Sequence, residues 1–206
     1  MPAERPIDIA VFARAPVAGQ AKTRLMPLLG AEGAAALQRR LIERTLASAC
    51  ALPAARVTLW VAGDPAHPFI AGVAARFAVA VDEQAGADLG ERMHNAFAKA
   101  GGPLLLIGTD CPQLGPGDLQ AAAVALATHE VVIQPATDGG YVLIGLARPQ
   151  LQLFESIDWG GPRVLQQTRA RIATLGLRCA LRPALDDLDT PADLQRALAA
   201  GLLPAA

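Results

Sequence analysis

The feature of this chain that most constrains its fold is the regular alternation of short apolar runs with longer helical patterns. The first run, IDIAVFA at 7–13, is apolar enough for a buried strand and precedes a helical pattern at 31–49. The same alternation predicts strands at 57–61, 78–81, 104–108, 131–134, 141–146 and 177–181, and helices at 69–77, 89–100, 118–128, 162–175 and 191–200. Strands that alternate with helices predict a three-layer α/β/α fold around a mostly parallel sheet. The turn at 137–140 is the exception, because it predicts a local antiparallel pair.

Length and composition narrow the class of protein. The 206 residues contain no repeat or low-complexity linker, so we expect a single domain over 1–206. The chain is 52% hydrophobic, but its apolar runs are far shorter than the roughly 20 residues of a membrane-spanning helix. The start, MPAERP, lacks the features of a secretory signal, which favours a cytoplasmic protein. The net charge of −1 argues against a nucleic-acid interface, although a few local cations would suffice for a small anionic ligand.

The loop after the first predicted strand, PVAGQAKTRL at 16–25, contains Gly19, Lys22 and Arg24 and follows Arg14. It is not a Walker A loop, since two residues separate Gly19 from Lys22 and no earlier glycine is present. Arg and Lys side chains suit phosphate oxygens, and a glycine lets the backbone approach an anion closely. Ligands of open parallel sheets bind at the carboxyl ends of the strands, which favours anion binding over a merely solvated basic loop.

Acidic residues occur in two other loops. Asp110 follows the apolar strand in IGTDCPQLG, and LDDLDTPADL places Asp186, Asp187 and Asp189 just before a helix start that Thr190 can cap. Carboxylate oxygens suit Mg²⁺, which often binds one or two carboxylates together with substrate phosphates. The alternatives are an ordinary turn at Asp110 and a solvated acidic turn at the second loop.

Two further motifs have a structural and a functional interpretation. Asp138, Gly139 and Gly140 precede Tyr141 in QPATDGGYVLIGL, where they can form a hairpin turn or a floor for a substrate. Trp159 lies among glycine and proline in FESIDWGGP, where it can pack a loop or line an acceptor pocket. The residues alone do not separate these interpretations.

The motifs occur in one order along nearly the whole chain: PVAGQAKTRL, EQAGADLGERM, IGTDCPQL, QPATDGGYVLIGL, FESIDWGG and LDDLDTPADL. Together they resemble the DUF2064 family, a group of bacterial proteins with the glycosyltransferase-A fold that are named as transferases. The chain is also distantly similar to the phospholactate and molybdenum-cofactor guanylyltransferases. It departs from these patterns at its first loop, which begins ARAP, and at its strand end, which reads T-D-C in place of D-x-D.

The resemblance implies a nucleotide-diphospho-sugar-transferase-like fold and a role for each motif residue. We expect catalytic residues Lys22, Arg24 and Asp110; nucleotide-binding residues Arg14, Gly19, Lys22, Arg24 and Gln84, the last near the base; metal ligands Asp110 and Asp189; and acceptor-side residues Asp138, Gly139, Gly140, Tyr141 and Trp159.

The expected function is a Mg²⁺- or Mn²⁺-dependent transferase with a nucleotide or nucleotide-sugar donor and a small-molecule acceptor. The cations of the first loop suit a triphosphate, which favours nucleotidyl transfer to a small phosphorylated or sugar-like acceptor. Glycosyl transfer from a nucleotide sugar and a non-catalytic nucleotide-binding module are the alternatives. The sequence leaves the oligomeric state, the base and the acceptor open.

Overall fold

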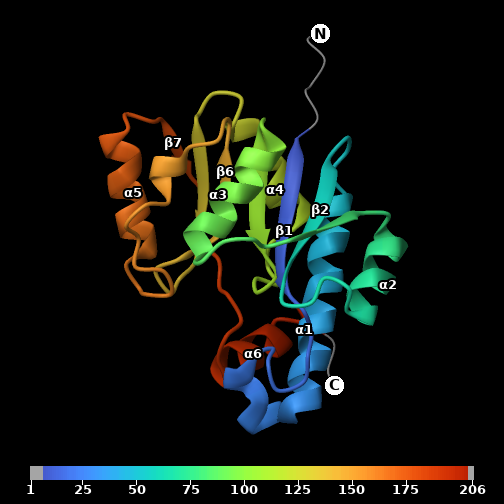
Figure 1. Cartoon of the computed structure of the whole chain (residues 1–206). Helices are drawn as coiled ribbons and strands as arrows, with labels where there is room; N and C mark the ends of the chain where they lie inside the picture. Colours follow the sequence, from blue (N-terminus) through green and yellow to red (C-terminus); the bar gives the residue numbers. More distant parts are fainter. Residues whose placement is uncertain (1–6, 204–206) are drawn as a thin grey trace.

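The computed structural model describes residues 7–203, and within them the chain forms a mixed sheet of seven strands (Figure 1). The strands are β1 (Asp8–Arg14), β2 (Arg56–Ala62), β3 (Ala80–Glu83), β4 (Leu104–Gly108), β5 (Val131–Pro135), β6 (Tyr141–Leu146) and β7 (Cys179–Leu181). Their order in the sheet is β3-β2-β1-β4-β6-β5-β7. Only β6 runs antiparallel to its neighbours, β4 and β5, so the predicted mostly parallel sheet with one local antiparallel element is confirmed.

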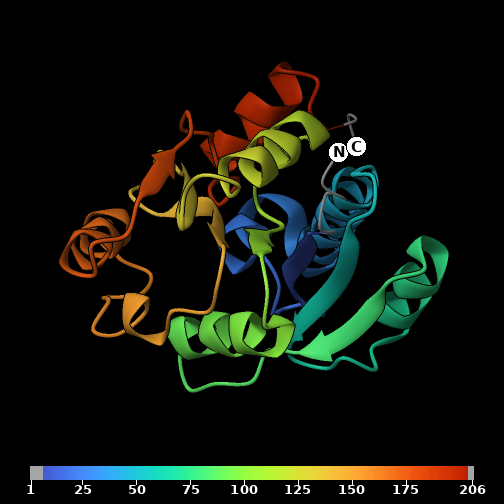
Figure 2. The same ribbon diagram turned by 90° about the horizontal axis from the view of Figure 1, so that it is seen from above.

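Helices cover both faces of the sheet, as the alternation predicts. They are α1 (Met26–Cys50), α2 (Pro68–Phe77), α3 (Leu89–Ala100), α4 (Pro116–Ala125), α5 (Val164–Thr174) and α6 (Pro191–Ala199), with short 3₁₀ turns η1 (Thr23–Leu25) and η2 (Leu151–Leu153). Alternate residues of β1 point to opposite sides, so Ile9 and Val11 pack with α1, α2 and α4, whereas Ala10 and Phe12 pack with α3, η2 and α5. Figure 2 shows the sheet from above, with α3 and α5 on the side opposite α1 and α4.

A third, smaller core lies beyond the carboxyl edge of the sheet. It joins η1 and α1 to α6, through Leu25, Leu37, Leu41, Leu188, Leu194, Ala197 and Leu203. Figure 1 shows α6 and the start of α1 packed together below the main sheet. The first and last parts of the chain therefore meet at the edge where the ligand site is expected.

Several helix boundaries differ from the predicted ones by one to five residues, and two of the early starts have a clear cause. Helix α1 begins at Met26 and not at residue 31, because a short turn precedes a kink at Gly30, whose φ of 70° suits glycine. Helix α4 begins at Pro116 and not at residue 118, because the Asp118 carboxylate accepts a hydrogen bond from the backbone N–H of Gly115 and caps the helix from within. The predicted caps are confirmed at Asp88 for α3 and at Thr190 for α6.

Among the described helices, none combines the length and the apolar character that crossing a bilayer requires. The MPAERP segment, on which the expectation of a cytoplasmic protein rests, lies at residues 1–6, outside the described residues. The domain limits of 1–206 likewise extend beyond residues 7–203 at both ends.

Candidate active site

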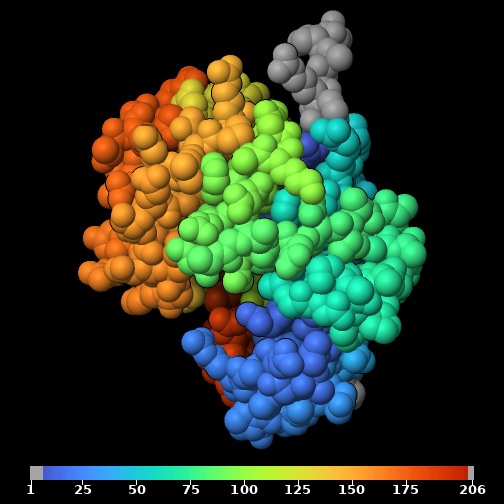
Figure 3. Space-filling view, viewed as in Figure 1, coloured from blue at the N-terminus to red at the C-terminus, as the bar shows by residue number. Residues whose placement is uncertain are grey.

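The predicted site residues of the two halves of the chain come together at the carboxyl edge of the sheet. Strands β1 and β4 are parallel neighbours, so the loop after Arg14 and the loop after Gly108 leave the sheet side by side. The segment 182–190 reaches the same edge, because β7 runs parallel to β5. Figure 3 shows a recess between the blue segment around the start of α1 and the green and orange segments above it, with the red C-terminal segment inside.

Lys22 is the centre of the contacts at this edge. Its ammonium Nζ lies 2.8 Å from Asp110 Oδ1 and 3.1 Å from Asp189 Oδ1, and it also donates to the carbonyl oxygen of Leu188. The Lys22 side chain is only 6% exposed, whereas those of Asp110 and Asp189 are 48% and 40% exposed. An ammonium has three N–H donors, and each of them has an acceptor here. Lys22 thus joins two carboxylates that are separated by 79 positions in the sequence.

The backbone also holds the acidic segment in place. The N–H of Leu188 donates to the carbonyl oxygen of Asp110 at 2.7 Å, while the carbonyl oxygen of Leu188 accepts from Lys22. The Leu188 side chain is 1% exposed and belongs to the small core between α1 and α6. Asp189, the next residue, is therefore positioned opposite Asp110 by a buried anchor and by two hydrogen bonds of that anchor's backbone.

The three aspartates of the acidic segment have different surroundings. Asp186 accepts a hydrogen bond from Thr137 Oγ1 at 2.8 Å, which ties it to the β5–β6 turn. Burial, together with the charges of Asp138 and Asp189, raises the pKa of Asp187 to about 6. Asp189 is the member of the three that contacts Lys22, so the structure favours it as the partner of Asp110.

The remaining basic residues of the first loop are open to solvent. Arg24 is 75% exposed, and its Nη1 lies 3.8 Å from Asp189 Oδ2. Arg14 is exposed at the end of β1, and Gly19 is exposed in the turn with a φ of 81°. Lys22 also has a positive φ, of 48°, which is uncommon for a residue with a side chain. Arg14 and Arg24 are the side chains of this loop with charge available to a ligand.

Comparisons with known proteins give the family and the fold class of this chain. Residues 45–161 match the family model described as "Uncharacterized protein conserved in bacteria (DUF2064)". The chain belongs to the DUF2064 family. A phosphoenolpyruvate guanylyltransferase from Geodermatophilus obscurus is 32% identical over 191 residues, which cover 89% of this chain and 85% of that protein.

Solved structures place this DUF2064 protein in the glycosyltransferase-A class. A candidate nucleotide-diphospho-sugar transferase from Desulfovibrio desulfuricans G20 superposes with a TM-score of 0.85 at 32% identity, over 93% of this chain and 85% of that chain. A glucosyl-3-phosphoglycerate synthase from Mycobacterium tuberculosis has a TM-score of 0.59 at 14% identity, over 97% of this chain and 78% of that chain, and shows a shared fold alone. The expected family and fold class are thus confirmed.

The donor set of this DUF2064 protein suits a hard divalent cation. Within residues 7–203 no three His, Cys, Asp or Glu side chains are grouped to hold a metal by themselves. Asp110 and Asp189 are partly exposed carboxylates that contact Lys22 through Oδ1, and Asp189 Oδ2 lies 3.8 Å from Arg24 Nη1. Mg²⁺ typically takes one or two carboxylates from a protein while water and phosphate oxygens complete its shell, so this pair is enough for such a cation.

Gln84, predicted to lie near the base, binds the protein backbone with its amide nitrogen. Its Nε2 donates to the carbonyl oxygens of Ala13, at 3.0 Å, and Trp60, at 2.9 Å. These bonds fasten the loop after β3 to the ends of β1 and β2. Both N–H donors are used in this way, so a contact with a base would fall to the amide oxygen, and that role stays a prediction.

The predicted acceptor-side glycines have a packing role. Gly139 has a φ of 96°, and a Cβ there would lie 2.1 Å from the carbonyl oxygen of Pro162. Its own carbonyl oxygen accepts from the N–H of Leu165, so the β5–β6 turn is docked on the start of α5. The N–H of Gly140 donates to Asp138 Oδ1 at 2.8 Å within the turn. The hairpin interpretation accounts for these three turn residues, and an acceptor role stays a prediction.

Tyr141 and Trp159 both make packing contacts. The Tyr141 hydroxyl lies 4.0 Å from Met93 Sδ, and burial raises the pKa of Tyr141. The Trp159 ring lies 6.4 Å from that of Phe154, and a Cβ at Gly90 would be 2.6 Å from its indole nitrogen. The structure thus gives Trp159 the loop-packing role that was one of its two interpretations, and a contact with an acceptor stays a prediction.

Two polar residues next to the site were not predicted. Gln38 of α1 and Thr109 after β4 are each 3% exposed, and Gln38 Nε2 donates to Thr109 Oγ1 at 3.3 Å. A signal for Gln38 was present in the sequence, since position 38 lies on the same helix face as the apolar residues at 34, 41 and 42. A polar residue on the buried face of a helix requires a hydrogen-bond partner.

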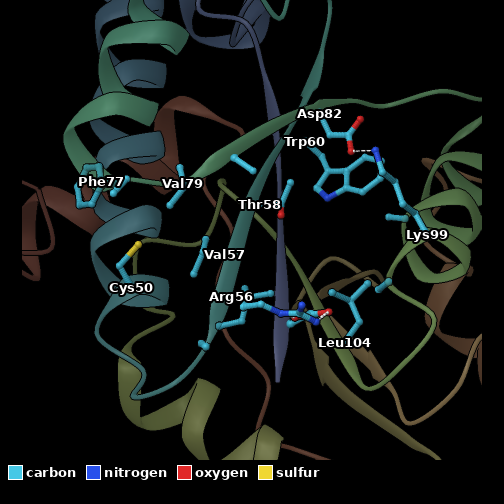
Figure 4. A pocket seen from close by; sticks show the side chains of 17 residues that line it. Cys50, Arg56, Val57, Thr58, Trp60, Phe77, Val79, Asp82, Lys99 and Leu104 are labelled. Carbon is cyan, nitrogen blue, oxygen red and sulfur yellow. Dashed lines mark hydrogen bonds and ion pairs between the residues drawn. The ribbon is translucent and has the colours of Figure 1, made fainter. Parts of the chain in front are cut away.

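A separate pocket of about 680 Å³ is lined by β2, β3 and α3 and contains none of the predicted site residues (Figure 4). Lys99 pairs there with Asp82 and lies 5.5 Å from the centre of the Trp60 ring. Arg56 pairs with Asp8 at 2.7 Å. The charges of this pocket are satisfied within the protein, so we do not assign a ligand to it.

Proposed function

We propose that this protein is a transferase that uses a nucleotide donor, and that it transfers a nucleotidyl group from a nucleoside triphosphate to a small acceptor. The observation that carries the proposal is the arrangement of Lys22 between Asp110 and Asp189 at the carboxyl edge of a glycosyltransferase-A fold. Exposed Arg14 and Arg24 lie at the two ends of the same connection, from the end of β1 to η1. Transfer from a nucleotide needs carboxylates that hold a metal ion and basic side chains that bind the phosphates.

The related proteins support a nucleotide donor. The relative from Geodermatophilus obscurus is named a guanylyltransferase, and the similar structure from Desulfovibrio desulfuricans is a candidate nucleotide-diphospho-sugar transferase. The synthase from Mycobacterium tuberculosis was solved with Mn²⁺ and uridine diphosphate. A nucleotide and a divalent cation are therefore the ligands that we propose for this chain, and we propose that residues 1–206 act as one domain.

Each residue at the edge has a proposed task. Asp110 and Asp189 would hold Mg²⁺ or Mn²⁺, which when bound neutralises charge that develops on the leaving phosphate. Lys22 holds the two carboxylates at a short separation and adds one positive charge beside them. Arg24, and Arg14 across the loop, would bind the phosphate oxygens of the donor, because guanidinium groups match phosphate geometry.

Glycosyl transfer from a nucleotide sugar is the second candidate, and the name of the Desulfovibrio relative favours it. The two reactions differ in their leaving group, which is pyrophosphate in nucleotidyl transfer and a nucleoside diphosphate in glycosyl transfer. We favour nucleotidyl transfer because one loop carries Arg14, Lys22 and Arg24, a density of cations that suits a triphosphate.

The test begins with a thermal-shift screen of nucleoside triphosphates and nucleotide sugars, each with and without Mg²⁺. A ligand that binds only the folded state raises the melting temperature, so the donor class is read from the largest shift. The selected triphosphate is then incubated with small phosphorylated acceptors, phosphoenolpyruvate among them, and pyrophosphate release is followed by ³¹P NMR.

Acceptor-dependent pyrophosphate release supports the proposal, whereas release of a nucleoside diphosphate from a nucleotide sugar supports the second candidate. Binding without turnover under all of these conditions would indicate a nucleotide-binding module. Asp110→Asn should abolish turnover in a folded protein. Asp82→Asn is the matched control, because Asp82 pairs with Lys99 in the separate pocket.

A further inference from the structure

We propose that Gln38 and Thr109 form a buried positioning pair that orients the Asp110 carboxylate and links the end of β1, where the basic loop begins, to the loop after β4. The inference rests on the proposed function, since it assigns Asp110 its task in the same site. Neither residue is a catalytic residue, because both are buried behind the groups that would meet the substrate.

Burial is the first observation. Within residues 7–203 five polar residues are buried: Gln38, Thr45, Thr109, Gln134 and Thr168. Two of these five, Gln38 and Thr109, contact each other directly behind Asp110. A buried amide or hydroxyl costs stability unless it is hydrogen-bonded. A polar pair at this buried position therefore indicates a role that needs hydrogen bonds and that an apolar pair of the same size could not have.

The directions of the hydrogen bonds are the second observation. Gln38 Nε2 donates to the carbonyl oxygen of Arg14, at 3.5 Å, and to Thr109 Oγ1, at 3.3 Å. Because the Thr109 oxygen accepts from Gln38, its own proton is available to Asp110 Oδ1, which lies 3.5 Å away. The chain of contacts therefore runs from the backbone at the end of β1, through Gln38 of α1, to the carboxylate that follows β4.

The consequence for Asp110 is that its two oxygens take different partners. Oδ1 receives the Thr109 hydroxyl and the Lys22 ammonium, which lies at 2.8 Å. Oδ2 is then the oxygen left to a cation. Groups that hydrogen-bond a metal ligand in this way typically change metal affinity or activity by about 10–100-fold when they are removed.

Thr109→Val tests the pair, because valine keeps the shape of threonine and removes the hydroxyl. We expect kcat to fall by about tenfold, with little change in the KM for the nucleotide, and the Mn²⁺ concentration for half-saturation, followed by electron paramagnetic resonance, to rise by a similar factor. Thr109→Ser retains a hydroxyl and should restore both quantities. Gln38→Leu, which removes both donors, should change them in the direction of Thr109→Val.

Thr45→Val is the matched control, because Thr45 is a buried threonine of the same helix that lies about two turns beyond Gln38. It should leave kcat and Mn²⁺ affinity unchanged even where it lowers the melting temperature. The proposal is overturned if Thr109→Val retains the kcat of the wild type. It is equally overturned if Thr109→Ser is as impaired as Thr109→Val, or if the loss in each variant follows its melting temperature.

Failure of the proposed function would look different. A wild-type protein without turnover or nucleotide binding would refute the transferase, yet a crystal structure of Thr109→Val still tests the orientation of Asp110. We expect the carboxylate to rotate and its contact with Lys22 to lengthen relative to a wild-type crystal. An unchanged Asp110 in that variant would refute the positioning pair on structural grounds alone.

Discussion

Replacement of Lys22 by methionine removes the charge that joins the two halves of the site and keeps much of the side-chain volume. The ammonium contacts Asp110 at 2.8 Å and Asp189 at 3.1 Å, and it is the donor to the carbonyl oxygen of Leu188. Without it, two carboxylates face each other at the edge of the sheet with no cation between them. We therefore expect Lys22→Met to lower the stability of the protein and to increase its affinity for divalent cations.

The magnitude follows from the burial of the partners. An exposed ion pair contributes about 0–1 kcal/mol, whereas removing one partner of a buried pair costs about 3–5 kcal/mol. Lys22 is 6% exposed but its two carboxylate partners are 48% and 40% exposed, so the loss should lie between these limits, at about 2 kcal/mol. For a protein of this size that corresponds to a decrease in melting temperature of about 4–8 °C.

The assay is urea unfolding together with thermal unfolding at increasing MgCl₂, without nucleotide. In the wild type the charge of Lys22 opposes a second cation, so Mg²⁺ should change the melting temperature little. In Lys22→Met, Mg²⁺ relieves the repulsion between Asp110 and Asp189 and should recover part of the lost stability. Arg24→Met is the control, because Arg24 is 75% exposed and should contribute little to stability. A Lys22→Met protein that is as stable as the wild type and insensitive to Mg²⁺ would refute this reasoning.

Three further predictions concern other parts of the molecule. Gly139→Ala should destabilise the protein, measured by urea unfolding, because the added Cβ would meet the carbonyl oxygen of Pro162; wild-type stability would contradict this docking of the β5–β6 turn. Cys111, which burial gives a pKa of about 11, should resist thiol reagents at pH 8 until the protein unfolds, and rapid labelling of the native protein would argue against its burial. Hydrogen bonds from Arg178 lower the pKa of Glu130 from 4.5 to about 2, so this carboxylate should stabilise the protein above pH 4.5 and lose that effect as the pH falls toward 2. The stability difference between the wild type and Glu130→Gln should therefore disappear over that interval, and a difference that persists at pH 2 would contradict it.

The fold was predictable because its determinants are local. Each apolar run of strand length became a strand, and the turn at 137–140 correctly predicted the antiparallel pair of β5 and β6. The position of β6 between β4 and β5 was not predictable in the same way, since strand order depends on packing between distant segments. The early start of α1 was not predictable, because Gly30 and the proline at position 27 are residues that favour a loop. In the structure the small core around Leu25 holds the helical turn that precedes the kink.

The proximity of Lys22 and Asp110 was predictable, because both residues lie in loops that follow the carboxyl ends of strands. Lys22 and Asp110 follow β1 and β4, and parallel neighbours bring such residues together whatever their separation in sequence. The number of acceptors around Lys22 was not predictable, because it depends on the docking of Leu188 in a core that the sequence does not reveal. Gln84 shows the same limit, since its amide is bound to carbonyl oxygens that only the folded sheet brings within reach.

The bridge formed by Lys22 also bears on how a divalent cation and a nucleotide would bind together. Asp110 and Asp189 together carry two negative charges and Lys22 carries one positive charge, which leaves a net charge of −1 for a divalent cation to meet. The phosphates of a nucleotide would add several negative charges and give Arg24 a partner, so under the proposed function a cation would be held far better in their presence than alone. We therefore expect Mg²⁺ and the nucleotide to bind cooperatively, with each lowering the Kd of the other by the same factor. Isothermal titration of the nucleotide with and without Mg²⁺ measures that factor, and a value near one would mean that the carboxylate pair does not hold a nucleotide-bound cation.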